Sequence, residues 1–290
     1  MGLRELSFDT GELVLNYAEG PDTGPPFVVL HGGAARWQYG EQFLRLLSDR
    51  WHVFAPDFRG HGRSGRGQNG SYQLADYVRD IGVFLAQAVP YPAVVYGHSL
   101  GGEVAVKTAA TRPDLFRALV VGDAPLSTDN LATEEPIHRA QNELWRRVAG
   151  RPVDEIVSAL KDMLVRTTAD APPRPAREYF GEDHRWFGHQ ALSLHQLDPA
   201  VLTAVLRGPA SMLGDYAPAR MLPSIVCPVL LLAADPRHGA VLQDEEARMA
   251  LALLPNATRV DLTGVGHPLH GSNPVETLAA VAPFLESVRP

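Results

Sequence analysis

The stretch Val94 to Gly102, which reads VVYGHSLGG, constrains the fold of this chain more than any other part of it. Residues 97–101 fit the pattern G-x-S-x-G, in which a serine stands on a sharp turn between a strand and a helix. Glycines permit the strained backbone and the close strand-to-helix approach of such a turn. By itself the pattern also fits a serine in an ordinary turn. With a β-branched run before it and a helical pattern after it, we expect Ser99 to be a nucleophile.

The order of the apolar runs predicts a mostly parallel sheet. Strands are expected at residues 3–8, 12–18, 27–30, 52–55, 93–96, 118–121, 228–233 and 259–262. Helices are expected at residues 38–47, 73–88, 102–110, 244–254 and 274–288. Because strands and helices alternate and most strands are continuously apolar, we expect an α/β fold with helices on both faces of the sheet.

Between Pro125 and Pro223 the alternation stops. The segment is too long for a plain connection, and its apolar spacing is helical. We therefore expect residues 126–222 to form a helical cap over the carboxyl edge of the sheet. Residues 1–125 and 223–290 would together form the core domain.

Composition and charge exclude several classes of protein. The 290 residues are 45% hydrophobic and 20% charged, as in ordinary globular proteins. A net charge of -7 disfavours a nucleic-acid or anionic-membrane partner. Cys227 is the only cysteine, so neither an intrachain disulfide nor a cysteine metal cluster is expected. No apolar run approaches the roughly 18 residues of a membrane helix, and no signal-peptide pattern opens the sequence, so we expect a cytoplasmic protein.

A serine hydroxyl needs a neighbouring base, and that base needs an orienting carboxylate. In a fold with this type of turn the chain order is serine, acid, histidine. Asp235 directly follows the apolar strand at 228–233 and is the first candidate for the acid. Asp123, at the end of the strand at 118–121, satisfies the same order and is the alternative acid.

The candidate base is His267, which follows the last expected strand in the sequence GVGH. Its glycines would let the loop turn sharply and present the imidazole. His270 lacks a glycine lead-in and His238 precedes the last strand, so both are weaker candidates.

The oxyanion of an acyl-transfer intermediate needs two backbone N–H groups. One should come from Leu100, the residue after the nucleophile, and the other from Gly33 in the loop His31-Gly32-Gly33. Trp37, His98 and Trp186 are candidates for the wall of a substrate pocket. The aromatic residues of the cap also fit simple packing.

Five motifs together resemble the α/β-hydrolase superfamily, over nearly the whole chain. They are HGG at 31–33, DFRGHGRS at 57–64, GHSLGG at 97–102, LLLAAD at 230–235 and GVGH at 264–267. The resemblance is to the capped, esterase-like branch. It implies an eight-stranded, mostly parallel sheet, a helical cap inserted after the sixth strand, and a Ser–Asp–His triad.

Two other patterns suggest different sites. Residues 60–65 match the dinucleotide fingerprint G-x-G-x-x-G, but no helix opens at the third glycine, so a structural loop is the better interpretation. His184, His189 and His195 fit no known zinc spacing, so no metal is expected there. We expect no cofactor.

The combined pattern predicts a serine hydrolase acting on a small-molecule carboxylic ester or lactone. Relatives that share the triad also suggest a carbon–carbon bond hydrolase or a thioesterase. A hydrolase-like ligand receptor is the alternative from a different class. The sequence indicates neither the substrate nor the oligomeric state.

Overall fold

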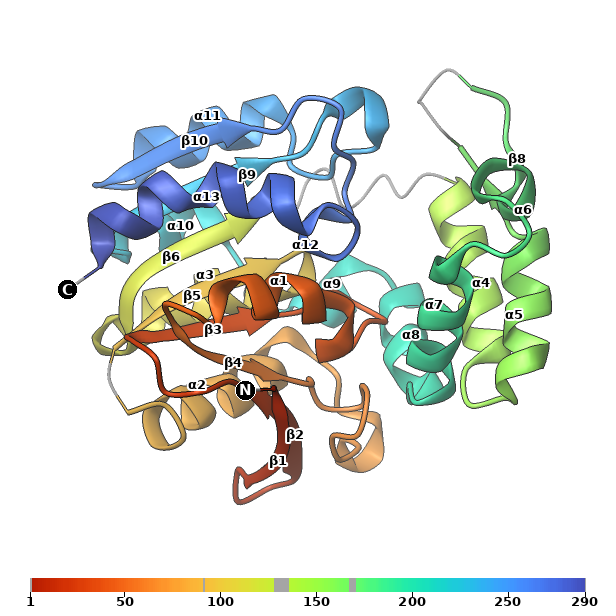
Figure 1. The fold of residues 1–290 in the computed structure, drawn as a ribbon, viewed down its shortest axis with the longest axis horizontal. Helices are drawn as coiled ribbons and strands as arrows, with labels where there is room; N and C mark the ends of the chain where they lie inside the picture. Colours follow the sequence, from red (N-terminus) through yellow and green to blue (C-terminus); the bar gives the residue numbers. More distant parts are fainter. Residues whose placement is uncertain (1, 91, 128–135, 167–170, 290) are drawn as a thin grey trace.

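The structure, a computed structural model, describes residues 2–90, 92–127, 136–166 and 171–289. Eight strands form its main sheet, in the order β1-β2-β4-β3-β5-β6-β9-β10 (Figure 1). The strands are β1 (Arg4–Asp9), β2 (Val14–Glu19), β3 (Pro26–Leu30), β4 (His52–Pro56), β5 (Ala93–His98), β6 (Phe116–Gly122), β9 (Val229–Ala233) and β10 (Ala257–Asp261). The predicted α/β-hydrolase fold is thus confirmed.

The six strands from β4 to β10 are parallel, and β1 and β2 join them as an antiparallel hairpin. The central strands are buried on both faces, which explains their continuous apolar sequences. In β3, for example, Val28 and Leu30 pack into one core and Phe27 and Val29 into the other. This alternation follows from the two-residue period of a strand.

Helices cover both faces of the sheet. The core helices are α1 (Glu41–Leu47), α2 (Leu74–Gln87), α3 (Leu100–Thr111), α11 (Asp244–Leu253), α12 (Leu269–Ser272) and α13 (Pro274–Val288). Buried residues of α2, α3 and α11 belong to the first core, whereas those of α1 and α13 belong to the second. The expected helices at 244–254 and 274–288 end within one residue of α11 and α13.

A group of helices stands between β6 and β9 in the sequence. It consists of α4 (Pro136–Val148), α5 (Val153–Asp162), α6 (Ala176–Phe180), α7 (Arg185–His195), α8 (Pro199–Leu206), α9 (Pro209–Leu213) and α10 (Pro218–Met221), with a short strand pair β7 (Leu164–Val165) and β8 (Arg174–Pro175). Figure 1 shows α4 to α8 beyond the carboxyl ends of β5 and β6. We call α4 to α8 the cap helices. Two parts of the expected cap, 128–135 and 167–170, lie outside the described residues.

Helices α7 and α8 are separated by a short break at residues 196–198. The side chain of Asp198 accepts a hydrogen bond from the backbone N–H of Ala200 and caps the start of α8. Pro199 occupies the first helical position, where its missing N–H is harmless. The same Asp198 carboxylate accepts a hydrogen bond from the hydroxyl of Tyr72, 2.6 Å away in the core. The residues between α7 and α8 therefore also connect the cap helices to the core.

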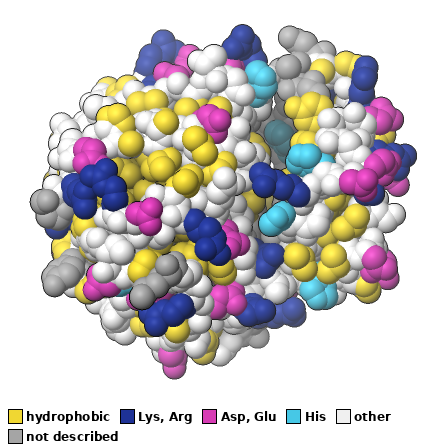
Figure 2. Space-filling view, viewed as in Figure 1, with side chains coloured by type: hydrophobic (Ala, Val, Ile, Leu, Met, Phe, Trp, Pro, Cys, Tyr) yellow, Lys and Arg dark blue, Asp and Glu magenta, His cyan; other side chains and the backbone are white. Residues whose placement is uncertain are grey.

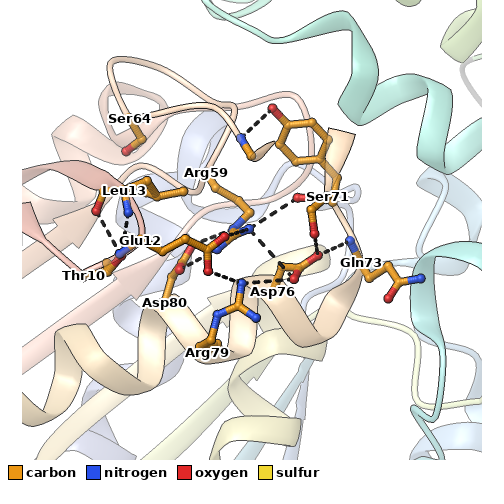
Figure 3. Close-up of polar contacts among 12 residues, drawn as sticks. Thr10, Glu12, Leu13, Arg59, Ser64, Ser71, Gln73, Asp76, Arg79 and Asp80 are labelled. Atoms are coloured by element: carbon orange, nitrogen blue, oxygen red, sulfur yellow. Dashed lines mark hydrogen bonds and ion pairs between the residues drawn. The ribbon is translucent and has the colours of Figure 1, made fainter. Parts of the chain in front are cut away.

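The loop after β4 is fixed by a buried arginine (Figure 3). The Arg59 side chain is fully buried, and its Nε and Nη2 each donate to the carboxylate of Asp80 on α2 at 2.7 Å. Its Nη1 reaches Glu12 at 3.2 Å and Asp76 at 3.9 Å. Because a buried guanidinium needs such partners, the β1–β2 hairpin, this loop and α2 are held together here.

None of the helices in the described ranges has both the length and the apolar character needed to cross a bilayer.

Candidate active site

Ser99 lies at the expected turn, between the end of β5 and the start of α3. Its backbone is strained, with φ 52° and ψ -122°, and its side chain is half-buried. A Cβ at Gly101 would collide with the backbone oxygens of Leu30 and His31, which explains the glycine at that position. The turn therefore brings β3, β5 and α3 into close contact and leaves the Ser99 hydroxyl at the carboxyl edge of the sheet.

His267 follows β10 and donates from Nδ1 to Oδ2 of Asp123, 2.7 Å away. The ring must carry its proton on Nδ1 because a carboxylate can only accept, so Nε2 is left with a lone pair for a proton. Asp123 follows β6, has a left-handed backbone with φ 42° and is fully buried. The structure thus brings the alternative acid, Asp123, to the predicted base.

Backbone amides hold the Asp123 carboxylate as an anion. The N–H groups of Val241 and Leu242 donate to it at 3.0 and 3.1 Å. Burial alone would raise the pKa of Asp123, but the hydrogen bond and charge of His267 and these amides outweigh burial and lower the pKa. An ionised carboxylate at this place orients the imidazole and stabilises its protonated form.

The expectation that Asp235 orients His267 is wrong. Both oxygens of Asp235 face its own loop, where Oδ1 accepts from Arg237 Nε at 3.1 Å and Oδ2 accepts from Arg237 Nη2 at 2.8 Å and from Gly264 N–H at 2.8 Å. The hydrogen bonds from the Arg237 side chain, followed by those from the backbone N–H groups of Gly264 and Arg237, lower the pKa of Asp235. Asp235 therefore closes the loop that leads to His267 and does not contact the imidazole.

The predicted oxyanion donors are Leu100, which follows Ser99 in the chain, and Gly33, which follows a glycine that lies close to Ser99. Leu100 begins α3, and its N–H belongs to the first turn of that helix, where backbone N–H groups have no helical partner. Gly32 lies against the nucleophile, since a Cβ there would be 3.3 Å from Cβ of Ser99 and 2.9 Å from Nδ1 of His98. The next residue, Gly33, is exposed, with open space where a Cβ would stand. The backbone of Gly33 is thus accessible, one residue after the contact between Gly32 and Ser99.

His98, a predicted pocket residue, contacts His267. Its ring is buried, lies 4.7 Å from the His267 ring at 36°, and donates from Nε2 to the backbone oxygen of His267 at 2.8 Å. Burial, and then the charges of His267 and His270, lowers the pKa of His98 well below its usual range, so the ring is neutral. Nδ1 of His98 has no hydrogen-bond partner among the described residues.

The other two pocket candidates pack elsewhere. Trp37 belongs to the second core, and its Nε1 donates to Glu5 on β1 at 2.8 Å. These contacts give Trp37 a role in packing, and its place in a pocket wall stays a prediction. Trp186, on α7, stacks on Phe180 with ring centroids 5.1 Å apart, so it contributes to packing within the cap.

Residues 60–65 and two of the three cap histidines, His184 and His195, make structural contacts. No helix begins at Gly65, whose N–H bonds to Val14 of β2, so residues 60–65 form a loop without the dinucleotide geometry. His184 caps α7 through Trp186 N–H, and His195 bonds to the backbone oxygen of Arg151. The described part of the chain contains no group of His, Cys, Asp and Glu side chains arranged to hold a metal ion.

Two residues near the HGG loop were missed by the sequence analysis as parts of the site. His61 accepts the Ala34 N–H on Nε2 at 3.2 Å, and Gln190 of α7 donates to the Ala34 oxygen at 3.2 Å. His61 lies in the recognisable GHGRS motif, which could have indicated it. Gln190 is an ordinary helical position, and no sequence pattern marks it.

The surface is hollowed where the core faces the cap helices, and histidine side chains and positively charged side chains stand along this furrow (Figure 2). The carboxyl ends of β5 and β6, which carry Ser99 and Asp123, point toward the same side (Figure 1).

Comparison with known proteins agrees with this architecture. The chain is 27% identical to 2-(acetamidomethylene)succinate hydrolase of Mesorhizobium japonicum over 280 residues, covering 96% of this chain and 94% of that protein. Its fold resembles the crystal structure of N-formylmaleamic acid deformylase from Pseudomonas putida, with a TM-score of 0.73, 20% identity and coverage of 96% and 100%. It also resembles a thermophilic esterase of Thermogutta terrifontis, with a TM-score of 0.71, 19% identity and coverage of 99% and 100%. A family model described as "Alpha/beta hydrolase family" matches residues 27–281. The chain therefore belongs to the alpha/beta hydrolase family.

Proposed function

We propose that this chain is a serine hydrolase that cleaves a carboxylic ester or lactone through an acyl-enzyme on Ser99. The observation that carries the proposal is the 2.7 Å hydrogen bond from His267 to Asp123 at the sheet edge that holds the strained Ser99. This pairing supports a base with a fixed tautomer at the sheet edge where the proposed nucleophile lies.

In the proposed reaction Oγ of Ser99 attacks the carbonyl carbon while Nε2 of His267 takes the hydroxyl proton. The N–H groups of Gly33 and Leu100 stabilise the oxyanion, and Asp123 stabilises the imidazolium. His267 then gives its proton to the leaving alkoxide, which departs as an alcohol. In the second half His267 removes a proton from water, hydroxide attacks the acyl carbon, and Ser99 regains its proton as the acid is released.

Hydrolysis of p-nitrophenyl acetate by the wild type and by Ser99→Ala tests this proposal. We expect turnover by the wild type and a loss of at least about 10³-fold in kcat for the variant, because the nucleophile is gone. Undiminished turnover by Ser99→Ala would overturn the assignment.

A second candidate is the hydrolysis of a small carboxylic acid that carries an N-acyl group. It is favoured by the full-length similarity to 2-(acetamidomethylene)succinate hydrolase, and the same triad performs acyl transfer from amides. The kcat/KM for 2-(acetamidomethylene)succinate should be compared with that for p-nitrophenyl acetate and for a lactone. A value for the N-acyl acid that exceeds both others would replace the ester proposal by this one.

The same assay panel separates the remaining alternatives. A thioester and a β-diketone test the thioesterase and the carbon–carbon hydrolase. If a substrate acylates the protein once and none of the substrates is turned over, the result would favour the ligand-receptor alternative over an enzyme. The net charge of -7 supports a small-molecule partner over a nucleic acid.

A further inference from the structure

Ala34, the residue after the proposed oxyanion donor Gly33, has an unusual backbone. Its φ is 52°, in the left-handed region that non-glycine residues avoid. Such a conformation persists only where the surroundings hold it in place. The contacts that hold Ala34 therefore fix the peptide group between Gly33 and Ala34. Through this group they constrain the backbone of Gly33.

One of these contacts comes from the core. Nε2 of His61 accepts the N–H of Ala34 at 3.2 Å, and Nδ1 of His61 donates to the backbone oxygen of Arg59 at 3.0 Å. Burial lowers the pKa of His61 to about 4, so the ring stays neutral and keeps one donor and one acceptor. Because Arg59 is fixed by its buried ion pairs (Figure 3), this side of the Ala34 backbone is rigid.

The other contact comes from the cap. Nε2 of Gln190 donates to the oxygen of Ala34 at 3.2 Å. Gln190 is 9% exposed and lies on α7, whose neighbouring residues Phe187, Ala191 and Leu194 are buried in the first core. The packing of α7 thus fixes the place of the Gln190 amide.

We propose that Gln190 is a positioning residue that holds the oxyanion loop from the cap, so that the position of α7 controls the direction of the Gly33 N–H. This inference rests on the proposed acyl-transfer function. It assigns the cap a part in the chemical step: a shift of α7 away from the core removes the donor from the Ala34 oxygen and releases the strained loop. The oxyanion hole is then complete only when the cap is seated.

Two substitutions at Gln190 test the hydrogen bond. Gln190→Leu has no donor at any pH, whereas Gln190→Glu has none when ionised and regains an O–H donor when protonated. Gln196→Leu is the matched control, because Gln196 ends the same helix and its Oε1 has no partner among the described residues. The assay is hydrolysis of p-nitrophenyl acetate from about pH 8 to about pH 6, with thermal unfolding of each variant.

We expect both Gln190 variants to lose about 10- to 100-fold in kcat near pH 8 with little change in KM, somewhat less than the loss of an oxyanion donor itself. The ratio of Gln190→Glu to wild-type kcat should rise as the pH falls, because burial and the facing Ala34 oxygen raise the pKa of the new carboxyl above the usual value of about 4.3, so that it becomes a donor toward pH 6. The ratio for Gln190→Leu should stay flat, and Gln196→Leu should keep wild-type kcat.

Wild-type kcat in Gln190→Leu would overturn the inference. So would equal, pH-independent losses in both Gln190 variants that match a fall in melting temperature, since that pattern indicates a purely structural role. Ser99→Ala separates this test from the proposed function. If Ser99→Ala is inactive and Gln190→Leu is fully active, only the role of Gln190 fails; if Ser99→Ala is fully active, the proposed function itself fails.

Discussion

The carboxylate of Asp123 lies 2.7 Å from Nδ1 of His267, although the two residues are 144 positions apart in the chain. β6 and β9 are neighbours in the sheet, so Asp123 and Asp235 leave the sheet side by side. Only Asp123 faces the imidazole, because Arg237 and Gly264 occupy the oxygens of Asp235. This difference in partners decides which carboxylate serves the candidate triad.

We expect Asp123→Asn to lower kcat by about 10⁴-fold, because the amide favours the wrong imidazole tautomer and cannot stabilise its charge. Asp235→Asn should keep kcat within about tenfold, since Asp235 acts on the loop and not on the ring. Steady-state hydrolysis of p-nitrophenyl acetate by both variants provides the measurement. A severe loss in Asp235→Asn alone would show that the acid is misassigned.

We also predict that the contact of His98 with His267 supports catalysis. His98→Leu removes the donor to the His267 backbone and the ring beneath the imidazole, and we expect kcat to fall about 10- to 100-fold, as for a displaced catalytic group. His98→Gln keeps an N–H donor of similar reach and should recover most of the activity. Equal kcat values for the wild type and His98→Leu would contradict this support.

A buried carboxyl on α3 predicts a pH dependence of stability. Glu103 is 5% exposed, and burial, together with the charge of Glu246, raises its pKa from 4.5 to about 8. Between these values the unfolded chain has released the proton while the folded protein keeps it. This group therefore stabilises the fold most below pH 4.5, and its contribution falls as the pH rises to about 8.

The variant Glu103→Gln isolates this contribution, because its amide does not titrate. The free energy of unfolding of the wild type, relative to the variant, should fall between about pH 5 and about pH 8 by up to about 1.4 kcal/mol per pH unit. Urea unfolding at a series of pH values measures it. A difference that is constant with pH would show that Glu103 is ionised in the folded protein.

The buried network of Arg59 predicts a loss of stability. Arg59→Met leaves Asp80 buried without its partner, and we expect the free energy of unfolding to fall by about 3–5 kcal/mol. Arg79→Ala is the control, because the Arg79 side chain is 50% exposed and its ion pairs should contribute only about 0–1 kcal/mol. Similar losses in the two variants, measured by urea unfolding, would contradict this assignment.

Much of the fold is predictable from local sequence. The elbow at Ser99, the continuous apolar strands and the closing helix from Pro274 to Val288 follow from glycine spacing and hydrophobic period, which act over a few residues. His267 follows from chain order. In these places the local signal and the tertiary structure agree.

The local sequence does not decide between Asp123 and Asp235 as the acid of the candidate triad. Asp123 and Asp235 both end apolar strands and both satisfy the chain order, so the pattern does not distinguish them. The deciding contacts are the Arg237 pair of Asp235 and the Val241 and Leu242 amides at Asp123. Of these, only the Arg237 pair is local in sequence.

Gln190 and Trp37 depend on tertiary structure in the same way. The proposed role of Gln190 depends on its contact with Ala34, 156 positions away in the chain. Trp37 follows that loop in sequence, yet its indole faces β1. Closeness in sequence to the HGG loop therefore does not indicate which way a side chain points.

The central claim is that Ser99 is a nucleophile activated by His267 and Asp123. It is tested most directly by reaction with a fluorophosphonate, followed by mass spectrometry of the tryptic peptide that spans residues 80–107. We expect one phosphonyl group on Ser99 in the wild type and in Asp235→Asn, much slower labelling in Asp123→Asn, and none in Ser99→Ala. Unlabelled Ser99 in the folded wild type, or equal rates in Asp123→Asn and the wild type, would contradict the account.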